Sequence, residues 1–270
     1  MNTIIKLLSI ILIFGTLASC GDDTDEITLD PFAELTLIET VAVTDTDMTV
    51  KIFTGGKSAL YVGYNAYQVG LFDADDNQIT DADIMVMPMM DMGEMKHSAP
   101  HEHQTFTNSE NELHSFSTVF QMPSSDMGKW SLDFTVKNNN NDAQGTVSVI
   151  VPITMPVEER MKSFDTASGK LFVSLVDDIA PEVGVNDFEI TIHQKMSMMD
   201  WPAVENYTIE IVPEMPSMGH GSPNNVNPTH SQNGHYMGKV NYTMTGYWKV
   251  NVNIYDGEEL IIETSFDITF

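Results

Sequence analysis

Two segments of the chain alternate apolar and polar residues with a period of two. Residues 130–136 read WSLDFTV and residues 248–254 read WKVNVNI, so every second side chain in each segment is apolar. This alternation indicates a β-strand that buries one face. No long segment has helical periodicity, and Gly, Pro and Asn separate the short apolar runs. The pattern therefore favours an all-β fold of antiparallel sheets.

The two alternating segments belong to a longer internal repeat of about 120 residues. Each begins two residues after a glycine, Gly128 or Gly246, and each follows a Val-Gly-x-Asn motif, at 62–65 or 183–186. A nearly constant offset between several landmarks indicates duplication. We therefore expect two tandem immunoglobulin-like antiparallel β-sandwich domains, because about 100 residues suit that architecture.

The repeats set the expected domain boundaries. The first sandwich is predicted to span 31–155 and the second 169–270, with a linker at 156–168. Within the linker, PVEERMKSF (156–164) predicts one helical turn. NNNND (138–142) is typical of a hairpin tip, because Asn and Asp tolerate turn geometry.

The N-terminal residues are predicted to be a lipoprotein signal peptide. Lys6 precedes an apolar run that ends in Leu-Ala-Ser-Cys, with the cysteine at position 20. A short positive region, a short apolar core and small residues are typical of a secretory signal, and Cys20 after them resembles a bacterial lipobox. We expect a signal peptide at 1–19, lipidation of Cys20 and an acidic tether at 20–30. The protein would then be a cell-envelope lipoprotein on an outer-membrane, periplasmic or surface face.

Composition excludes several classes of site. Cys20 is the only cysteine, so the chain cannot form an internal disulfide. With the thiol of Cys20 lipidated, no thiolate remains for a blue-copper centre or a cysteine-held iron–sulfur cluster. The formal net charge is -27, and this excess of acids makes nucleic acid an unsuitable partner, because phosphate binding needs a basic patch. An acidic surface does concentrate cations.

Methionine and histidine gather in one stretch of each repeat. Residues 85–103 hold six methionines and three histidines, out of 19 and 8 in the whole chain. Thioether sulfur is a soft neutral ligand for Cu(I), and imidazole binds Cu(I), Cu(II) and zinc. We expect one copper site per repeat, with Cu(I) favoured. The candidate ligands are Met90, Met92, His97, His101 and His103 in the first repeat, and Met215, Met218, His220 and His235 in the second.

Methionine also fills cores without binding metal. Some of Met85, Met87, Met89 and Met90 must face the core if they lie on a strand. Met122 and Met244, which precede the two tryptophans, are predicted core residues. His193 alternates with apolar neighbours and is predicted to be exposed. HEH at 101–103 is expected in a loop.

The second repeat resembles the YtkA-like domain family. The resemblance rests on Met215-Pro216, on SMGHG at 217–221 and on the aromatic strand region 236–254. The first repeat resembles the family more loosely, because Gly93 is not followed by His and four extra residues precede Trp130. The resemblance implies small secreted or membrane-anchored β-sandwiches related to FixH-type proteins, without enzymatic activity and often encoded near copper-handling genes.

These observations give a leading functional hypothesis and an alternative. The leading one is a non-enzymatic lipoprotein that binds copper for sequestration or delivery, with a copper-handling protein as partner. No G-x-S-x-G, H-E-x-x-H or Walker motif points to catalysis. The alternative is a surface or periplasmic scaffold or adhesion module that binds a protein or a polysaccharide, with the Met/His stretches as adaptable contact surfaces.

The lipid anchor can be tested directly. Replacing Cys20 with Ala removes the thiol that would carry the lipid, so we expect the variant to leave the membrane fraction when cells are fractionated. Asp22→Asn, which keeps Cys20, is the control and should stay with membranes. Unchanged partitioning of the Cys20→Ala protein contradicts the lipoprotein prediction.

Overall fold

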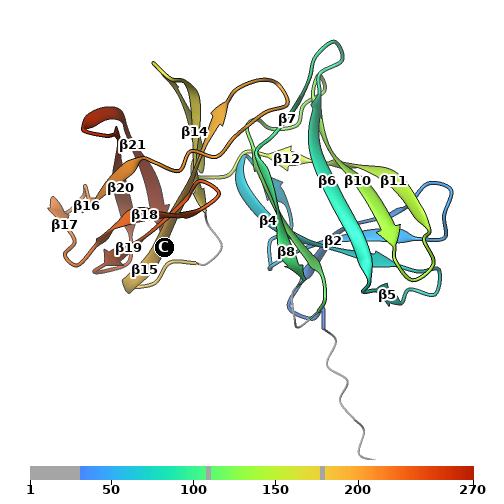
Figure 1. Ribbon diagram of the computed structural model, residues 1–270. Coiled ribbons are helices and arrows are strands. Elements are labelled where there is room, and N and C mark those ends of the chain that lie inside the picture. The colour runs from blue at the N-terminus through green and yellow to red at the C-terminus, as the bar shows by residue number, and fades with distance from the viewer. Residues whose placement is uncertain (1–30, 108–110, 177–179) are drawn as a thin grey trace, which may run out of the picture. The chain divides into compact units, whose positions relative to one another are not determined.

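A computed structural model describes residues 31–107, 111–176 and 180–270, and these residues form strands and turns without any helix (Figure 1). Residues 31–270 make up one compact unit. The predicted signal peptide at 1–19, Cys20 and the tether at 20–30 lie outside the described residues. Within the described part, no helix could span a membrane.

The first sandwich contains two antiparallel sheets and one short parallel pair. The strands of the larger sheet, in spatial order, are β1 (Thr36–Ala42), β2 (Thr49–Thr54), β4 (Gly63–Phe72), β9 (His114–Phe120) and β8 (His101–Thr107), with β5 (Gln78–Ile79) beside β4. Those of the smaller sheet are β11 (Gln144–Val151), β10 (Lys129–Asn138), β6 (Ala82–Asp91) and β7 (Lys96–Ser98). The parallel pair is β3 (Leu60–Tyr61) with β12 (Ile153–Thr154).

The second sandwich repeats this arrangement with two antiparallel sheets. One sheet contains β13 (Met161–Thr166), β14 (Gly169–Val176), β15 (Gly184–Lys195), β19 (His235–Tyr242) and β18 (Val226–Gln232). The other contains β17 (His220–Gly221), β16 (Thr208–Met215), β20 (Tyr247–Asp256) and β21 (Glu259–Thr269). The main strands of the two sandwiches follow the same order, so the prediction of an all-β fold with two immunoglobulin-like antiparallel sandwiches is confirmed.

The alternating segments that predicted strands form β10 and β20. Their tryptophans, Trp130 and Trp248, are both 0% exposed at the centre of their cores. Each indole N–H donates a hydrogen bond of 2.9 Å to a backbone carbonyl, that of Met122 or Met244. A buried indole needs such a partner for its one polar group. The same bond in both copies fixes each ring in an equivalent orientation.

A proline stands inside a strand of each smaller sheet. Pro88 on β6 and Pro213 on β16 cannot donate to a ladder, so they need a position where one side of the strand is unpaired. Strand β7 pairs only with Met89–Asp91, and β17 only with Glu214–Met215. Each proline therefore lies just beyond the end of a short ladder, which limits that ladder to the Met/His end of the strand.

Several local predictions need correction. The predicted helical turn at 156–164 is absent, and the predicted linker at 156–168 is too long, because β13 occupies Met161–Thr166 and pairs with β14. The HEH segment lies in β8 rather than in a loop. The hairpin tip at 138–142 is confirmed between β10 and β11.

Three burial predictions are wrong. Met122 and Met244 are exposed, because only their carbonyls turn inward to meet the indole N–H groups. His193 is buried although it alternates with apolar neighbours. His193 lies on the outer face of β15, and a following segment covers that face: Ala203 in this segment forms a bridge to His193.

We predict that Trp130→Ala and Trp248→Ala each lower the free energy of unfolding by about 3–5 kcal/mol, because each leaves a large cavity in a closed core. Denaturant unfolding of the single variants measures this loss. Met127→Ala, at a highly exposed position, is the matched control and should unfold like wild type. Wild-type stability for either Trp variant would mean that its ring does not fill a core.

Candidate functional site

Each smaller sheet brings one methionine and one histidine into register. Met90 on β6 pairs with His97 on β7, and Met215 on β16 pairs with His220 on β17. Directly opposed residues of an antiparallel pair have Cβ atoms about 5 Å apart. His220 follows Met215 by five residues and His97 follows Met90 by seven, so hairpins of different length produce the same Met–His pairing.

A buried tryptophan lies against the histidine of each pair. The ring centroids of His97 and Trp130 are 5.4 Å apart at an interplanar angle of 88°. Those of His220 and Trp248 are 5.9 Å apart at 74°. Both are edge-to-face contacts, which orient an imidazole on an aromatic surface. The two repeats thus carry equivalent Met–His–Trp clusters, one at Met90, His97 and Trp130, and one at Met215, His220 and Trp248.

Both histidines are held in the tautomer that a metal ligand needs. Nδ1 of His97 lies 2.8 Å from the carbonyl oxygen of Ser98, and Nδ1 of His220 lies 2.9 Å from that of Gly221. A carbonyl can only accept, so Nδ1 donates its hydrogen and Nε2 keeps its lone pair. Histidines that bind metals usually donate their other N–H in this way.

A glycine makes room for the thioether of each cluster. A Cβ added to Gly128 would lie 3.1 Å from Sδ of Met90 and 3.3 Å from Cγ of Met92. A Cβ added to Gly246 would lie 3.3 Å from Cε of Met215. Gly246 also has a φ of 127°, a conformation that side chains rarely adopt. The Gly-x-Trp motif therefore supplies both the space and the aromatic wall of each cluster.

The two clusters differ in access. His97 is buried, and the ring of Trp201 from the second repeat lies 6.2 Å from it. The amide of Ser98 donates to the carbonyl of Met198 at 2.8 Å, so this segment of the second repeat is fixed beside the first cluster. In the second cluster His220 is only partly buried and Met218 is 61% exposed.

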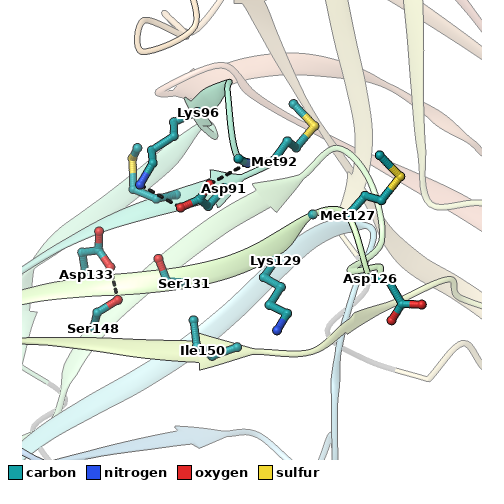
Figure 2. Close-up of a pocket in the computed structure, with 13 residues that line it drawn as sticks. Asp91, Met92, Lys96, Asp126, Met127, Lys129, Ser131, Asp133, Ser148 and Ile150 are labelled. Atoms are coloured by element: carbon teal, nitrogen blue, oxygen red, sulfur yellow. Dashed lines mark hydrogen bonds and ion pairs between the residues drawn. The ribbon is translucent and has the colours of Figure 1, made fainter.

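Further methionines surround the first cluster. Met92 and Met127 line a pocket on the outer side of the smaller sheet, and Figure 2 shows their side chains extending in the same direction. Asp91 lines the same pocket and forms an ion pair of 2.7 Å with Lys96. The hydrogen bond to Asp91 from the amide of Gly93 fixes the turn that follows β6. Lysine and this amide together hold the pKa of Asp91 below its usual range.

Not every predicted ligand joins these clusters. His101 and His103 lie on β8, in the larger sheet, and the ring of His103 stacks on Phe116 at 4.5 Å. Among the described residues, no group of three or more His, Cys, Asp or Glu side chains could hold a metal ion. Each cluster described above depends on a methionine thioether, and methionine is not among those residue types.

His235 belongs to a different arrangement that joins the two sandwiches. Its Nδ1 lies 2.5 Å from a carboxylate oxygen of Glu189, and its Nε2 lies 3.0 Å from one of Glu102. Glu102 comes from β8 of the first sandwich, whereas Glu189 and His235 come from the second. His235 lies on β19, in the other sheet from Met215 and His220, and both of its ring nitrogens are occupied. It therefore does not join the second cluster.

Burial and charge act in opposite directions on this group. Burial alone would lower the pKa of His235, but the hydrogen bonds to Glu102 and Glu189 outweigh it and raise the pKa to about 9. Burial opposes ionisation of Glu102 too, and the contact with His235 nevertheless lowers its pKa. Nearby His193 is buried with Nδ1 unpartnered, and desolvation lowers its pKa to about 4.

Sequence reasoning missed the parts of these sites that lie far apart in the chain. The role of Trp130 and Trp248 as walls of the clusters could have been inferred, because each follows its glycine at a constant offset. Met127 gave no such signal, because the second copy has Thr245 at the equivalent position before its glycine. Glu102 and Glu189 gave no signal, since nothing local pairs them with His235.

We predict that the Glu102–His235–Glu189 contact makes stability depend on pH on the alkaline side. The pKa of His235 is about 9 in the folded protein and 6.5 ordinarily. The contribution of this contact to the free energy of unfolding is therefore complete below pH 6.5 and disappears as pH rises through 9. Wild type should therefore lose on the order of 1–3 kcal/mol more than His235→Gln over this range. Denaturant unfolding at several pH values measures it, with His230→Gln as control. Parallel profiles for wild type and His235→Gln would contradict the assignment.

The fold and the Met–His–Trp clusters can now be compared with known proteins. No curated protein matches the chain. Among solved structures, the D00–D0 domain of intimin covers 78% of this chain and 95% of its own, at 10% identity and a TM-score of 0.24. A fragment of three immunoglobulin domains of titin covers 78% of this chain and 61% of its own, at 7% identity and a TM-score of 0.19. These likenesses concern the fold alone.

One family comparison reaches the second cluster. The matched residues include Met215, His220 and Trp248, and the strands that carry them. The YtkA-like family model matches residues 165–253, which lie mostly in the second sandwich.

Proposed function

We propose that this protein is a cell-envelope lipoprotein that binds Cu(I) at its two Met–His–Trp clusters and does not act as an enzyme. The observation that carries the proposal is the repetition of one arrangement in both sandwiches: a buried thioether paired with a histidine whose Nε2 lone pair is free. Sequence repetition alone could preserve a core methionine. It would not require each histidine to be oriented by a backbone carbonyl, as His97 and His220 are.

The ligand types favour copper in its reduced state. A thioether is soft and uncharged, so it stabilises Cu(I) and offers little to a hard, strongly hydrated cation. Zinc sites usually contain thiolates, several imidazoles or carboxylates, and neither cluster has them. An edge of Trp130 or Trp248 beside the imidazole limits the approach of water, which further favours an ion that needs few ligands.

The surroundings favour capture of cations from outside the cell or the periplasm. The net charge of -27 raises the local concentration of positive ions around the chain. Lipidation at Cys20 would hold the sandwiches at a membrane surface. Methionine and histidine, unlike cysteine, do not form disulfides in an oxidising compartment, so such sites stay available there.

The difference in access to solvent suggests a different role for each cluster. The first, covered by Trp201, suits storage, because an ion there would exchange slowly. The second, with Met218 exposed beside it, suits exchange with a copper-handling partner protein. Sequestration and delivery are then two properties of one chain.

The proposal is tested by counting metal. The chain from residue 21 onward, which contains the whole compact unit, is loaded with Cu(I) under reductant and desalted against a competing chelator. We expect two copper ions to be retained per chain. Met215→Leu with His220→Phe should reduce the number to one, since Leu and Phe keep volume but remove both donor atoms. Binding should also weaken in acid, because a protonated imidazole has no lone pair.

The control removes one methionine and one histidine elsewhere in the second sandwich, as Met237→Leu with His230→Gln. This variant should still retain two ions. If wild type retains none, the proposal fails and the scaffold or adhesion function becomes the better explanation. If the Met215/His220 variant retains as much as wild type, copper binds outside the clusters.

A further inference from the structure

Strand β6 carries three methionines on its outer face, away from the core. Met85 is 68% exposed and Met87 38% exposed, and Met89 is partly buried. The residues between them, Val86 and Pro88, point into the sandwich. Residues two apart on a strand share a face and lie about 7 Å apart. The thioethers of Met85, Met87 and Met89 therefore form a row, called here the outer methionine row.

No apolar side chain on the neighbouring strand accounts for this row. Across β10, Met85 is paired with Thr135, Met87 with Asp133 and Met89 with Ser131. The carboxylate of Asp133 accepts a hydrogen bond of 2.6 Å from Ser148. On the other side, β7 pairs only with Met89 and the two residues after it. The row therefore has hydroxyls and one carboxylate along one side, and lies beyond the β7 ladder over most of its length.

The equivalent strand of the second sandwich, β16, shows which residues folding requires on this outer face. Aligning Met90 with Met215, which have the same partners, places Glu214, Val212 and Glu210 at the positions of Met89, Met87 and Met85. Strand β16 pairs with β20 as β6 pairs with β10. Charged residues are therefore compatible with this face, and exposed methionine is not a requirement of the fold.

We propose that the outer methionine row is a further Cu(I) site, made of thioethers only. The inference rests on the proposed copper function, since it assigns the same ion to a second kind of site on the chain. Methionine side chains are long and unbranched, so three of them spaced along a strand can converge on one ion. Binding is an exchange of ligands: Cu(I) gives up solvent or a carrier ligand, accepts sulfur lone pairs and stays reduced.

The position of the row suggests its role. It lies on β6, the strand that also carries Met90, so an ion bound at Met89 is one residue along the backbone from the first cluster, although on the opposite face. It has no imidazole and is open to solvent, so it should bind more weakly and exchange faster than the two clusters. Its acidic neighbour Asp133 adds attraction for a cation without being needed as a ligand.

The test uses methionine labelled with ¹³C at the methyl group, in the chain from residue 21 onward, titrated with Cu(I) under reductant and without a competing chelator. Signals are assigned with single Met→Leu variants. We expect the methyl signals of Met85, Met87 and Met89 to shift together, after those of Met90 and Met215. The triple variant Met85→Leu, Met87→Leu, Met89→Leu should bind one ion fewer than wild type, with the Met90 and Met215 shifts unchanged.

The matched control changes three scattered exposed methionines, Met155, Met237 and Met244, to Leu; it should bind as many ions as wild type. Equal binding by the row variant and wild type overturns the inference, whatever the two clusters do. Shifts in the row without shifts at Met90 and Met215 refute the proposed clusters and support the row. Shifts at Met90 and Met215 without shifts in the row support the clusters alone and overturn the row.

Discussion

The packing of one tryptophan into each sandwich determines the rest of the arrangement. Trp130 and Trp248 fill the two cores, and each is fixed by a hydrogen bond from its indole to a backbone carbonyl. The glycine two residues earlier leaves space that a methionine side chain of the adjacent strand enters. The edge of the same ring then meets a histidine of the short neighbouring strand. The side chains that fill each core therefore also hold the candidate metal ligands in place. A change in the core should disturb the ligands, and a change in the ligands should disturb the core.

The two copies share this local structure but not its surroundings. Trp201 and the backbone of Met198, both from the second repeat, lie beside His97. In the second cluster, by contrast, His220 is only partly buried and Met218 is exposed beside it. Duplication thus gives one enclosed cluster and one accessible cluster from nearly the same sequence pattern, and under the proposed function an ion would exchange more slowly at the enclosed one.

The contact between the sandwiches depends on a charged group rather than on apolar area alone. His235 lies between Glu102 and Glu189, and the amide of Tyr64 donates to the hydroxyl of Ser174 at 2.8 Å. A buried histidine with a carboxylate at each nitrogen stays protonated well above its ordinary pKa. The cover over the first cluster should therefore persist at neutral pH, while deprotonation of His235 on the alkaline side weakens the contact that supports it.

The sequence by itself predicted the main strands, the duplication and the presence of one Met/His stretch and one Gly-x-Trp motif in each repeat. Period-two alternation and a nearly constant repeat offset can be recognised from the residues alone. The sequence also indicated that some of Met85, Met87, Met89 and Met90 face the core, but only the structure showed that Met90 does and that the other three face outward. Only the tertiary structure decided that His101 and His103 lie in the other sheet and that His193 is covered. It alone placed His235 against Glu102, which is 133 residues away. These outcomes depend on which faces of distant strands meet, and no local pattern of apolar and polar residues encodes that choice.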